Sequence, residues 1–172
     1  MKFLTPTDWQ DWCTKRQIPL RESGWIRPNI SPDHFQIVEV PYPQDSGAKV
    51  FLAQFLYSLV HPEPETLLLV DDWAVWPSSQ HMPLFTRFRE SLGELRPLIE
   101  APGHLVEATE EDDAISVIAT SLLFLWDCYG ISASGQNAFY ISHDEYCRFA
   151  THDSSIAARV IEEIKSFSEP HA

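Results

Sequence analysis

The sequence predicts an α/β (or α+β) fold: a single domain over residues 1–172, with a mixed sheet of about five strands and helices packed on it. Apolar runs of strand length alternate along the chain with segments that repeat apolar residues at helical spacing. The 172 residues suffice for one hydrophobic core, and no shift in composition marks a second domain. We therefore expect one layered body with helices on one or both faces of the sheet.

Residues 1–33 are expected to hold one helix followed by an irregular loop. Thr5 and the proline after it are typical of a helix start, and Pro19 ends the helix. Glycine and proline residues between positions 21 and 33 predict a crossing loop. The buried face of the helix is expected to comprise Trp9, Trp12 and Cys13.

The segment 67–70 is apolar throughout, which is typical of an inner strand covered on both faces. Asp71 and Asp72 follow at its carboxyl end, and ligands usually bind at that edge of an open α/β sheet. The small residues at 132–137 predict a hairpin between two short strands. The full set of predicted strands is 35–40, 67–70, 104–106, 127–131 and 138–141.

Five further segments are predicted to be helices. Thr109 and Asp112 resemble a capping box, and Ser79 is in position to cap the helix before it. Ser142 is in position to cap a short helix that continues toward Phe149. The helix at 155–167 is expected to dock on the body of the domain. These helices cover about 48–60, 80–92, 110–126, 143–149 and 155–167.

The composition narrows the possible functions. The formal net charge of −13 repels phosphate backbones, so no nucleic acid is expected as a partner, and a basic protein is favoured. The three cysteines are widely spaced and form no CxxC pair, which predicts reduced core side chains. No segment is apolar over about 18 residues and the N-terminus lacks a secretory pattern, so we expect a cytoplasmic protein with no membrane span.

Several motifs in residues 66–150 together resemble an uncharacterised bacterial protein family of unknown function. They are DDWAVWPSS, FTRFRESLGELRPLIEAPGHL, WDCYGI and FYISHDEYCRF. The resemblance implies a bacterial source and a shared fold for this family-like core, and it implies no reaction, cofactor or substrate. The chain departs from the family pattern at 80–82 and 84–85, where an asparagine, a tryptophan and a tyrosine pair would be expected.

Two catalytic interpretations are compatible with the sequence. His104, His143 and Asp144, with a nearby carboxylate, are suited to hold a divalent cation and activate water, as in a small metal-dependent hydrolase. The alternative for His143 and Asp144 is a structural role in the cap and first turn of a helix. A thiol nucleophile at Cys128 or Cys147 is the second interpretation, and burial of both side chains in the core is its alternative.

The favoured interpretation is a non-enzymatic, immunity-like module that binds a protein, without a catalytic residue, metal or cofactor. Tryptophan and arginine are enriched at binding hot spots because they bury a large area and keep a polar group. The alternative for the same side chains is burial in the core, and self-association as a homo-oligomer is a further possibility. The candidate binding residues are Asp71, Asp72, Trp73, Trp76, Ser78, Ser79, His81, Arg87, Arg89, Glu100, His104, His143 and Asp144.

Overall fold

The structure is a computed structural model that describes residues 1–21, 26–61, 63–73 and 81–168. Within them, seven strands form one sheet in the order β1-β6-β5-β7-β8-β9-β4, and β2 and β3 form a separate ribbon. The strands are β1 (Lys2–Leu4), β2 (Leu20–Arg21), β3 (Arg27–Pro28), β4 (Gln36–Val40), β5 (Glu65–Val70), β6 (Gly103–Glu107), β7 (Cys128–Ser132), β8 (Asn137–Ile141) and β9 (Cys147–Thr151). The helices are α1 (Pro6–Lys15), α2 (Ser46–Val60), α3 (Met82–Ser91), α4 (Glu111–Phe124) and α5 (Ser154–Ser168).

The main sheet differs from the predicted one in size and direction. It has seven strands rather than about five, and every pairing in it is antiparallel, so the prediction of a mixed sheet is wrong. The sequence missed β1, which is only three residues long, and β9. Short turns join β7 to β8 and β8 to β9, and such connections produce antiparallel neighbours.

The prediction of an inner strand at 67–70 is confirmed. This segment forms most of β5, which pairs with β6 on one side and β7 on the other. The side chains of residues 67–70 are at most 3% exposed. Both neighbours run antiparallel to β5, so its carboxyl end meets their amino ends. The ligand-binding rule for the carboxyl edge of parallel sheets therefore does not apply here.

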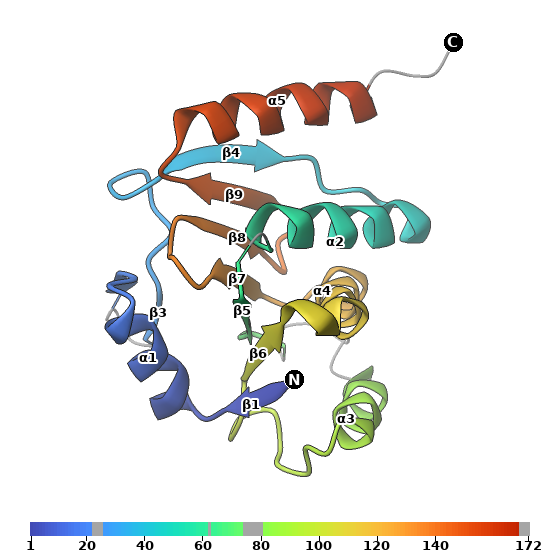
Figure 1. Cartoon of the computed structure of the whole chain (residues 1–172). Coiled ribbons are helices and arrows are strands. Elements are labelled where there is room, and N and C mark those ends of the chain that lie inside the picture. The colour runs from blue at the N-terminus through green and yellow to red at the C-terminus, as the bar shows by residue number, and fades with distance from the viewer. Residues whose placement is uncertain (22–25, 62, 74–80, 169–172) are drawn as a thin grey trace.

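Two hydrophobic cores lie on opposite faces of the sheet. Figure 1 shows α1 on one side of the sheet and α2, α3 and α4 on the other, with α5 beside β4. Leu68, Val70 and Phe139 join the core that contains residues of α2, α4 and α5. Leu67 and Leu69 point into the other core, with the buried tryptophans of α1. Alternation along β5 thus feeds both layers and explains its continuous apolar sequence.

The first helix follows its prediction closely. Thr5 forms a capping box with Asp8, whose backbone NH donates to Thr5 Oγ1 over 3.2 Å, and the expected face of α1 is buried. The predicted box at Thr109 is wrong, because the pair that closes around this turn is Glu107 and Glu110. A short 3-10 turn at Ala108–Glu110 therefore precedes α4.

The helix predicted after Ser142 is wrong as well. Residues 142–146 form a tight turn, in which the backbone NH of Ser142 donates to the Tyr146 carbonyl over 2.9 Å, and β9 follows. Cys147, Phe149 and Thr151 are all buried at a spacing of two residues, which fits a strand rather than a helix. The turn places His143 beside the start of β7 instead of on a helical face.

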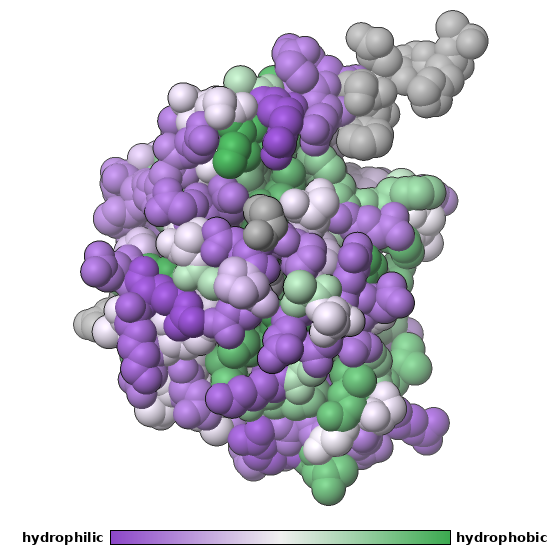
Figure 2. Space-filling view, in the orientation of Figure 1, coloured by the Kyte–Doolittle hydropathy of each residue, from purple (hydrophilic) through white to green (hydrophobic). Residues whose placement is uncertain are grey.

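The face of the molecule seen in Figure 2 is mostly hydrophilic, with local apolar areas. Among the described helices, none is both long and apolar enough to cross a membrane. Large hydrophobic side chains are nevertheless exposed, and they are Ile26, Val50, Phe51, Leu84, Leu95, Ile99, Leu123 and Ile161.

Candidate functional site

A row of polar and aromatic side chains crosses β7, β8, β9 and β4 on the α1 face of the sheet. Tyr129 pairs with Tyr140, Tyr140 with Arg148, and Arg148 with Glu39. Paired residues on adjacent strands project from the same face, so these four side chains stand next to one another. We call them the polar row: Tyr129, Tyr140, Arg148 and Glu39.

The polar row passes from the core to solvent. Tyr129 is 7% exposed and packs in the α1-side core, whereas the side chains of Arg148 and Glu39 are 42% and 64% exposed. The ring centroids of Tyr129 and Tyr140 lie 4.6 Å apart, and Arg148 Nε donates to Glu39 Oε1 over 2.8 Å. The rings and the guanidinium are therefore held in place by their neighbours within the protein.

Tyr146 extends the row at the β8–β9 turn. Its ring makes an edge contact with Tyr140 at a centroid separation of 5.7 Å. The guanidinium carbon of Arg148 lies 4.8 Å from the centroid of the Tyr146 ring, a cation–π arrangement. Tyr146 is half-buried, so one part of its ring remains accessible beside Arg148.

Asp127, just before β7, organises the polar groups at this end of the row. Its side chain is buried, yet its oxygens accept three hydrogen bonds: from the backbone NH of His143 over 2.8 Å, from the ring Nδ1 of His143 over 2.7 Å and from the Tyr140 hydroxyl over 2.8 Å. Each donor compensates for part of the cost of burying a carboxylate. The other ring nitrogen, Nε2, lies 3.7 Å from Asp144 Oδ1.

Asp71 joins the same group through the backbone and through Arg27. The NH of Asp71 donates to the Asp127 carbonyl over 2.9 Å, and the Asp127 NH donates to the Asp72 carbonyl over 2.9 Å. The Nε of Arg27 lies 2.5 Å from Asp71 Oδ2. Burial, together with the charges of Asp127 and Asp72, raises the pKa of the Asp71 carboxyl, although Arg27 acts in the opposite direction.

Several predicted site residues therefore meet, and others do not. Asp71, Asp72, His143 and Asp144 gather around Asp127, as described above. Trp73 is instead partly buried and packs against the core on the α2 and α4 side of the sheet. The other predicted residues of this segment, Trp76, Ser78 and Ser79, lie outside the described residues.

His104 and Arg89 belong to the core and not to an exposed surface. His104 is fully buried in β6, with ring centroids 5.4 Å from Phe3 and 5.8 Å from Phe85. Burial lowers the pKa of His104 to about 3, helped by the nearby Arg89 charge. Arg89 is 2% exposed and donates to the Ala101 carbonyl over 2.7 Å. Neither side chain is placed to contact a partner or to share a site with His143.

The remaining predicted residues lie around α3, away from the polar row. His81 is exposed, occupies the N-cap position of α3 where Ser79 had been expected, and stacks on Phe124 at 4.2 Å. Arg87 and Glu100 are exposed. The structure therefore does not bring Arg87 or Arg89 into one site with Asp71 and Asp72, which follow β5.

The chemistry available at the site is limited by these placements. Among the residues that the structure describes, no three His, Cys, Asp or Glu side chains form a group that could hold a metal ion. All three cysteines are buried, as predicted, and burial raises the pKa of Cys13 and of Cys128 to about 12. Burial also raises the pKa of Cys147, so none of the thiols is activated as a nucleophile.

Sequence reasoning missed the polar row and Asp127. The sequence did contain a signal for two residues of the polar row. A hairpin centred on the predicted loop 132–137 aligns Tyr129 with Tyr140, and the structure pairs them in this way. No comparable signal existed for Arg148, because its segment was interpreted as a helix. Arg27 lies in a segment without regular spacing, and only the tertiary structure brings it to Asp71.

Comparisons with protein-family models, with curated proteins and with solved structures each gave no significant match. The resemblance of residues 66–150 to an uncharacterised bacterial family thus stays a prediction from the motifs.

Proposed function

We propose that this protein is a non-enzymatic, cytoplasmic binding module of the immunity-like kind, and that it contacts a protein partner through the exposed end of the polar row. The observation that carries the proposal is the joint presence of Tyr140, Tyr146 and Arg148 on a part of the sheet face where they remain partly accessible. Tyrosine and arginine are the side chains that most often dominate binding energy, together with tryptophan.

The prior ordering of these side chains favours binding. Tyr140 is fixed by its hydroxyl bond to Asp127, and Arg148 is fixed between Glu39 and the Tyr146 ring. On binding, these side chains therefore lose less conformational entropy than mobile side chains would.

The charge of the surface favours a basic partner. Asp144 and Glu39 are exposed acids at this end of the row, with 65% and 64% of their side chains accessible. The net charge of −13 adds a long-range attraction for positively charged proteins. A basic toxin domain, inhibited by this acidic protein, is the kind of partner that fits best.

The test compares partner capture by variants of the row. Tagged wild-type protein is used to isolate a partner from cells that express the native gene, and the dissociation constant of that partner is then measured. We expect Tyr146→Ala and Arg148→Ala each to weaken binding about thirtyfold, which corresponds to about 2 kcal/mol. Leu95→Ala, which truncates an 82% exposed side chain shortly after α3 and outside the polar row, serves as the control. Equal affinity for all four proteins would refute the proposed surface.

A second candidate function is acid–base catalysis by His143, in a hydrolase. The observation in its favour is the contact of Nδ1 with buried Asp127, which leaves Nε2 as the atom able to take a proton. Elemental analysis of the purified protein, followed by the same analysis of His143→Ala, tests the metal-dependent form of this candidate. Stoichiometric metal that is lost in the variant would favour it over the binding module.

Self-association through the same row is the remaining alternative. Two copies of an acidic surface repel each other, so the partner is expected to be a different chain. Light scattering at several protein concentrations measures this directly. A stable dimer that Arg148→Ala dissociates would make the row a subunit interface.

A further inference from the structure

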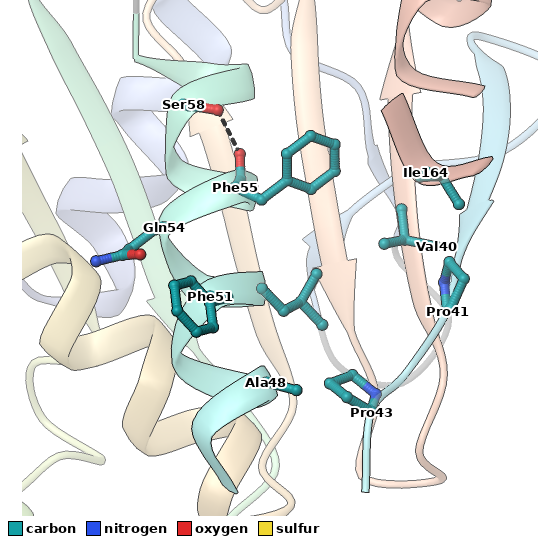
Figure 3. A pocket seen from close by; sticks show the side chains of 10 residues that line it. Val40, Pro41, Pro43, Ala48, Phe51, Gln54, Phe55, Ser58 and Ile164 are labelled. Atoms are coloured by element: carbon teal, nitrogen blue, oxygen red, sulfur yellow. Dashed lines mark hydrogen bonds between the residues drawn. The ribbon is translucent and has the colours of Figure 1, made fainter. Parts of the chain in front are cut away.

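A second feature, separate from the polar row, is a cavity of about 750 Å³ between α2, the segment that follows β4, and α5. Figure 3 shows Val40, Pro41 and Pro43 facing Ala48 and Phe55 of α2 across it, with Ile164 of α5 nearby and Phe51 toward the outer side of α2. The volume lies within the range of about 300–1,000 Å³ that is typical of small-molecule sites.

The wall formed by the segment after β4 is held open by specific contacts. The hydroxyl of Tyr42, between the two prolines, donates to the Leu122 carbonyl of α4 over 2.7 Å. The next turn ends at Asp45, whose carboxylate caps α2 by accepting from the Ala48 NH over 2.9 Å. Prolines restrict the backbone further. The opposing walls are therefore positioned without a ligand.

The described walls of the cavity carry no charge. Among the described residues that line it, none is ionisable, in a chain of which 22% of residues are charged, and the polar side chains are those of Gln54 and Ser58. Ser58 Oγ already donates to the Phe55 carbonyl over 2.6 Å. A charged group placed in this cavity would lose its hydration without gaining a counter-ion, which is costly.

Basic side chains on the flanking helices already have partners. Lys49 of α2 is buried with its ammonium 5.1 Å from the centroid of the Tyr42 ring, and Lys165 of α5 contacts Glu162 over 2.7 Å. Arg159 of α5 lies 3.7 Å from Glu163. On the described parts of these helices, each cation therefore already faces an acidic or aromatic group, and the net charge of the protein further opposes an anionic head group.

From these contacts we infer a binding site for a neutral molecule with a single alkyl or acyl chain, in which the chain occupies the cavity and an uncharged polar head remains at its open rim. The exposed Phe51 ring covers part of the chain at the rim. The absence of charge from the walls selects against the corresponding carboxylate. This site is independent of the proposed protein-binding surface.

The test uses 1-dodecanol and dodecanoate below their aggregation concentrations, with displacement of the neutral probe N-phenyl-1-naphthylamine as the signal. We expect dodecanol to displace the probe and dodecanoate to bind at least about tenfold more weakly, because its charge would be desolvated without a partner. Ala48→Trp fills the cavity and is expected to weaken dodecanol binding at least about tenfold, whereas the control Val50→Trp, on the same helix but outside the lining, is expected to keep it.

Three results would overturn the inference: no binding of dodecanol, equal binding of dodecanol and dodecanoate, or equal binding by Ala48→Trp and wild type. A dimer in light scattering that dissociates in Phe51→Ser would also overturn it, because a second copy would then cover the cavity. Should Ala48→Trp fail to fold, methyl NMR of the wild type decides. Dodecanol-induced shifts at Val40, Leu52 and Ile164 would support the site, and shifts confined to other methyl groups would reject it.

Discussion

The imidazole Nδ1 of His143 and the Oδ1 of Asp127 lie 2.7 Å apart, although 16 residues separate them in the chain. The same carboxylate accepts the backbone NH of His143 and, through its second oxygen, the Tyr140 hydroxyl. A single buried side chain thus links the start of β7, a residue of β8 and the β8–β9 turn. The orientation of His143 and of the Tyr140 end of the polar row depends on it.

We expect Asp127→Asn to lower the free energy of unfolding by about 1–3 kcal/mol. The NH2 group of asparagine cannot accept a hydrogen bond, so one of the donors from His143 or Tyr140 would lose its buried acceptor. Urea denaturation followed by tryptophan fluorescence measures the change. Asp144→Asn is the matched control, since that side chain is 65% exposed, and its effect should stay within about 0.5 kcal/mol. Equal stability of the two variants would show that the three hydrogen bonds contribute little.

His104 gives a prediction for pH dependence. Its pKa is about 6.5 in the unfolded chain and about 3 in the folded protein, so between these values the unfolded state binds more protons. Stability must therefore decrease as the pH falls from about 6.5 toward 3. We expect His104→Phe, which fits among Phe3 and Phe85, to remove this contribution. The difference in free energy of unfolding between the variant and wild type should therefore be up to about 2 kcal/mol more favourable to the variant at pH 5 than at pH 7.5.

Denaturation at a series of pH values provides the comparison, and NMR provides an independent measurement. The imidazole signals of His104 should not shift between pH 8 and pH 5 in the native protein. A titration of His104 near its ordinary pKa, or parallel stability profiles for wild type and His104→Phe, would contradict the buried neutral imidazole.

Gly130 of β7 lies directly beneath the Phe139 ring of β8. A Cβ atom at Gly130 would stand 2.1 Å from Cε1 and 2.3 Å from Cζ of that ring, far inside contact distance. Phe139 is fully buried, so it cannot move aside freely. We expect Gly130→Ala to destabilise the protein by about 1–3 kcal/mol or more. Thermal and urea unfolding measure this loss.

The double variant Gly130→Ala/Phe139→Leu tests the cause of that loss. Leucine lacks the ring atoms that a Cβ at Gly130 would meet, so the two substitutions together should cost less than the sum of their separate effects. Strict additivity would mean that the steric conflict with Phe139 is not what makes glycine necessary.

Local sequence patterns predicted the elements whose environment is simple. β5 is apolar because it is buried on both faces, and α1 combines a cap, a proline and a regular buried stripe, so each carries its own signal. The sequence of β9 gives a mixed signal. Its buried residues include Ala150 and Cys147, while the preceding Ser142, His143 and Asp144 are suited to a helix cap, so propensity favoured the wrong element.

The site was predictable in part for the same reason. Asp71 and Asp72 follow a strand that the sequence identifies, and His143 and Asp144 stand out as a polar pair. Their meeting point, Asp127, depends on the antiparallel order β5-β7-β8-β9, which no local pattern specifies. The predicted grouping with His104 and Arg89 is wrong because both side chains are buried in the core. Histidine and arginine occur both in cores and at exposed sites, so residue type alone did not distinguish the two.

Glu94 gives the last prediction, which concerns stability in acid. Its carboxylate accepts the Arg96 backbone NH over 2.8 Å and the Arg96 Nε over 2.9 Å, and these contacts with Arg96 lower the pKa of Glu94 from 4.5 to about 2. Below pH 4.5 the unfolded chain takes up a proton at Glu94 that the folded protein does not, so this stabilisation is lost as the pH falls from 4.5 to about 2.

We expect Glu94→Gln to be less stable than wild type at pH 6 and to approach it near pH 2.5, because wild type loses the ion pair over that range and the variant never has it. Acid titration of unfolding by circular dichroism measures both profiles. Glu90→Gln, at an exposed position of α3, is the control and should follow wild type throughout. A Glu94→Gln profile parallel to wild type would show that the contact with Arg96 forms equally well in the unfolded chain, as its separation of two residues permits.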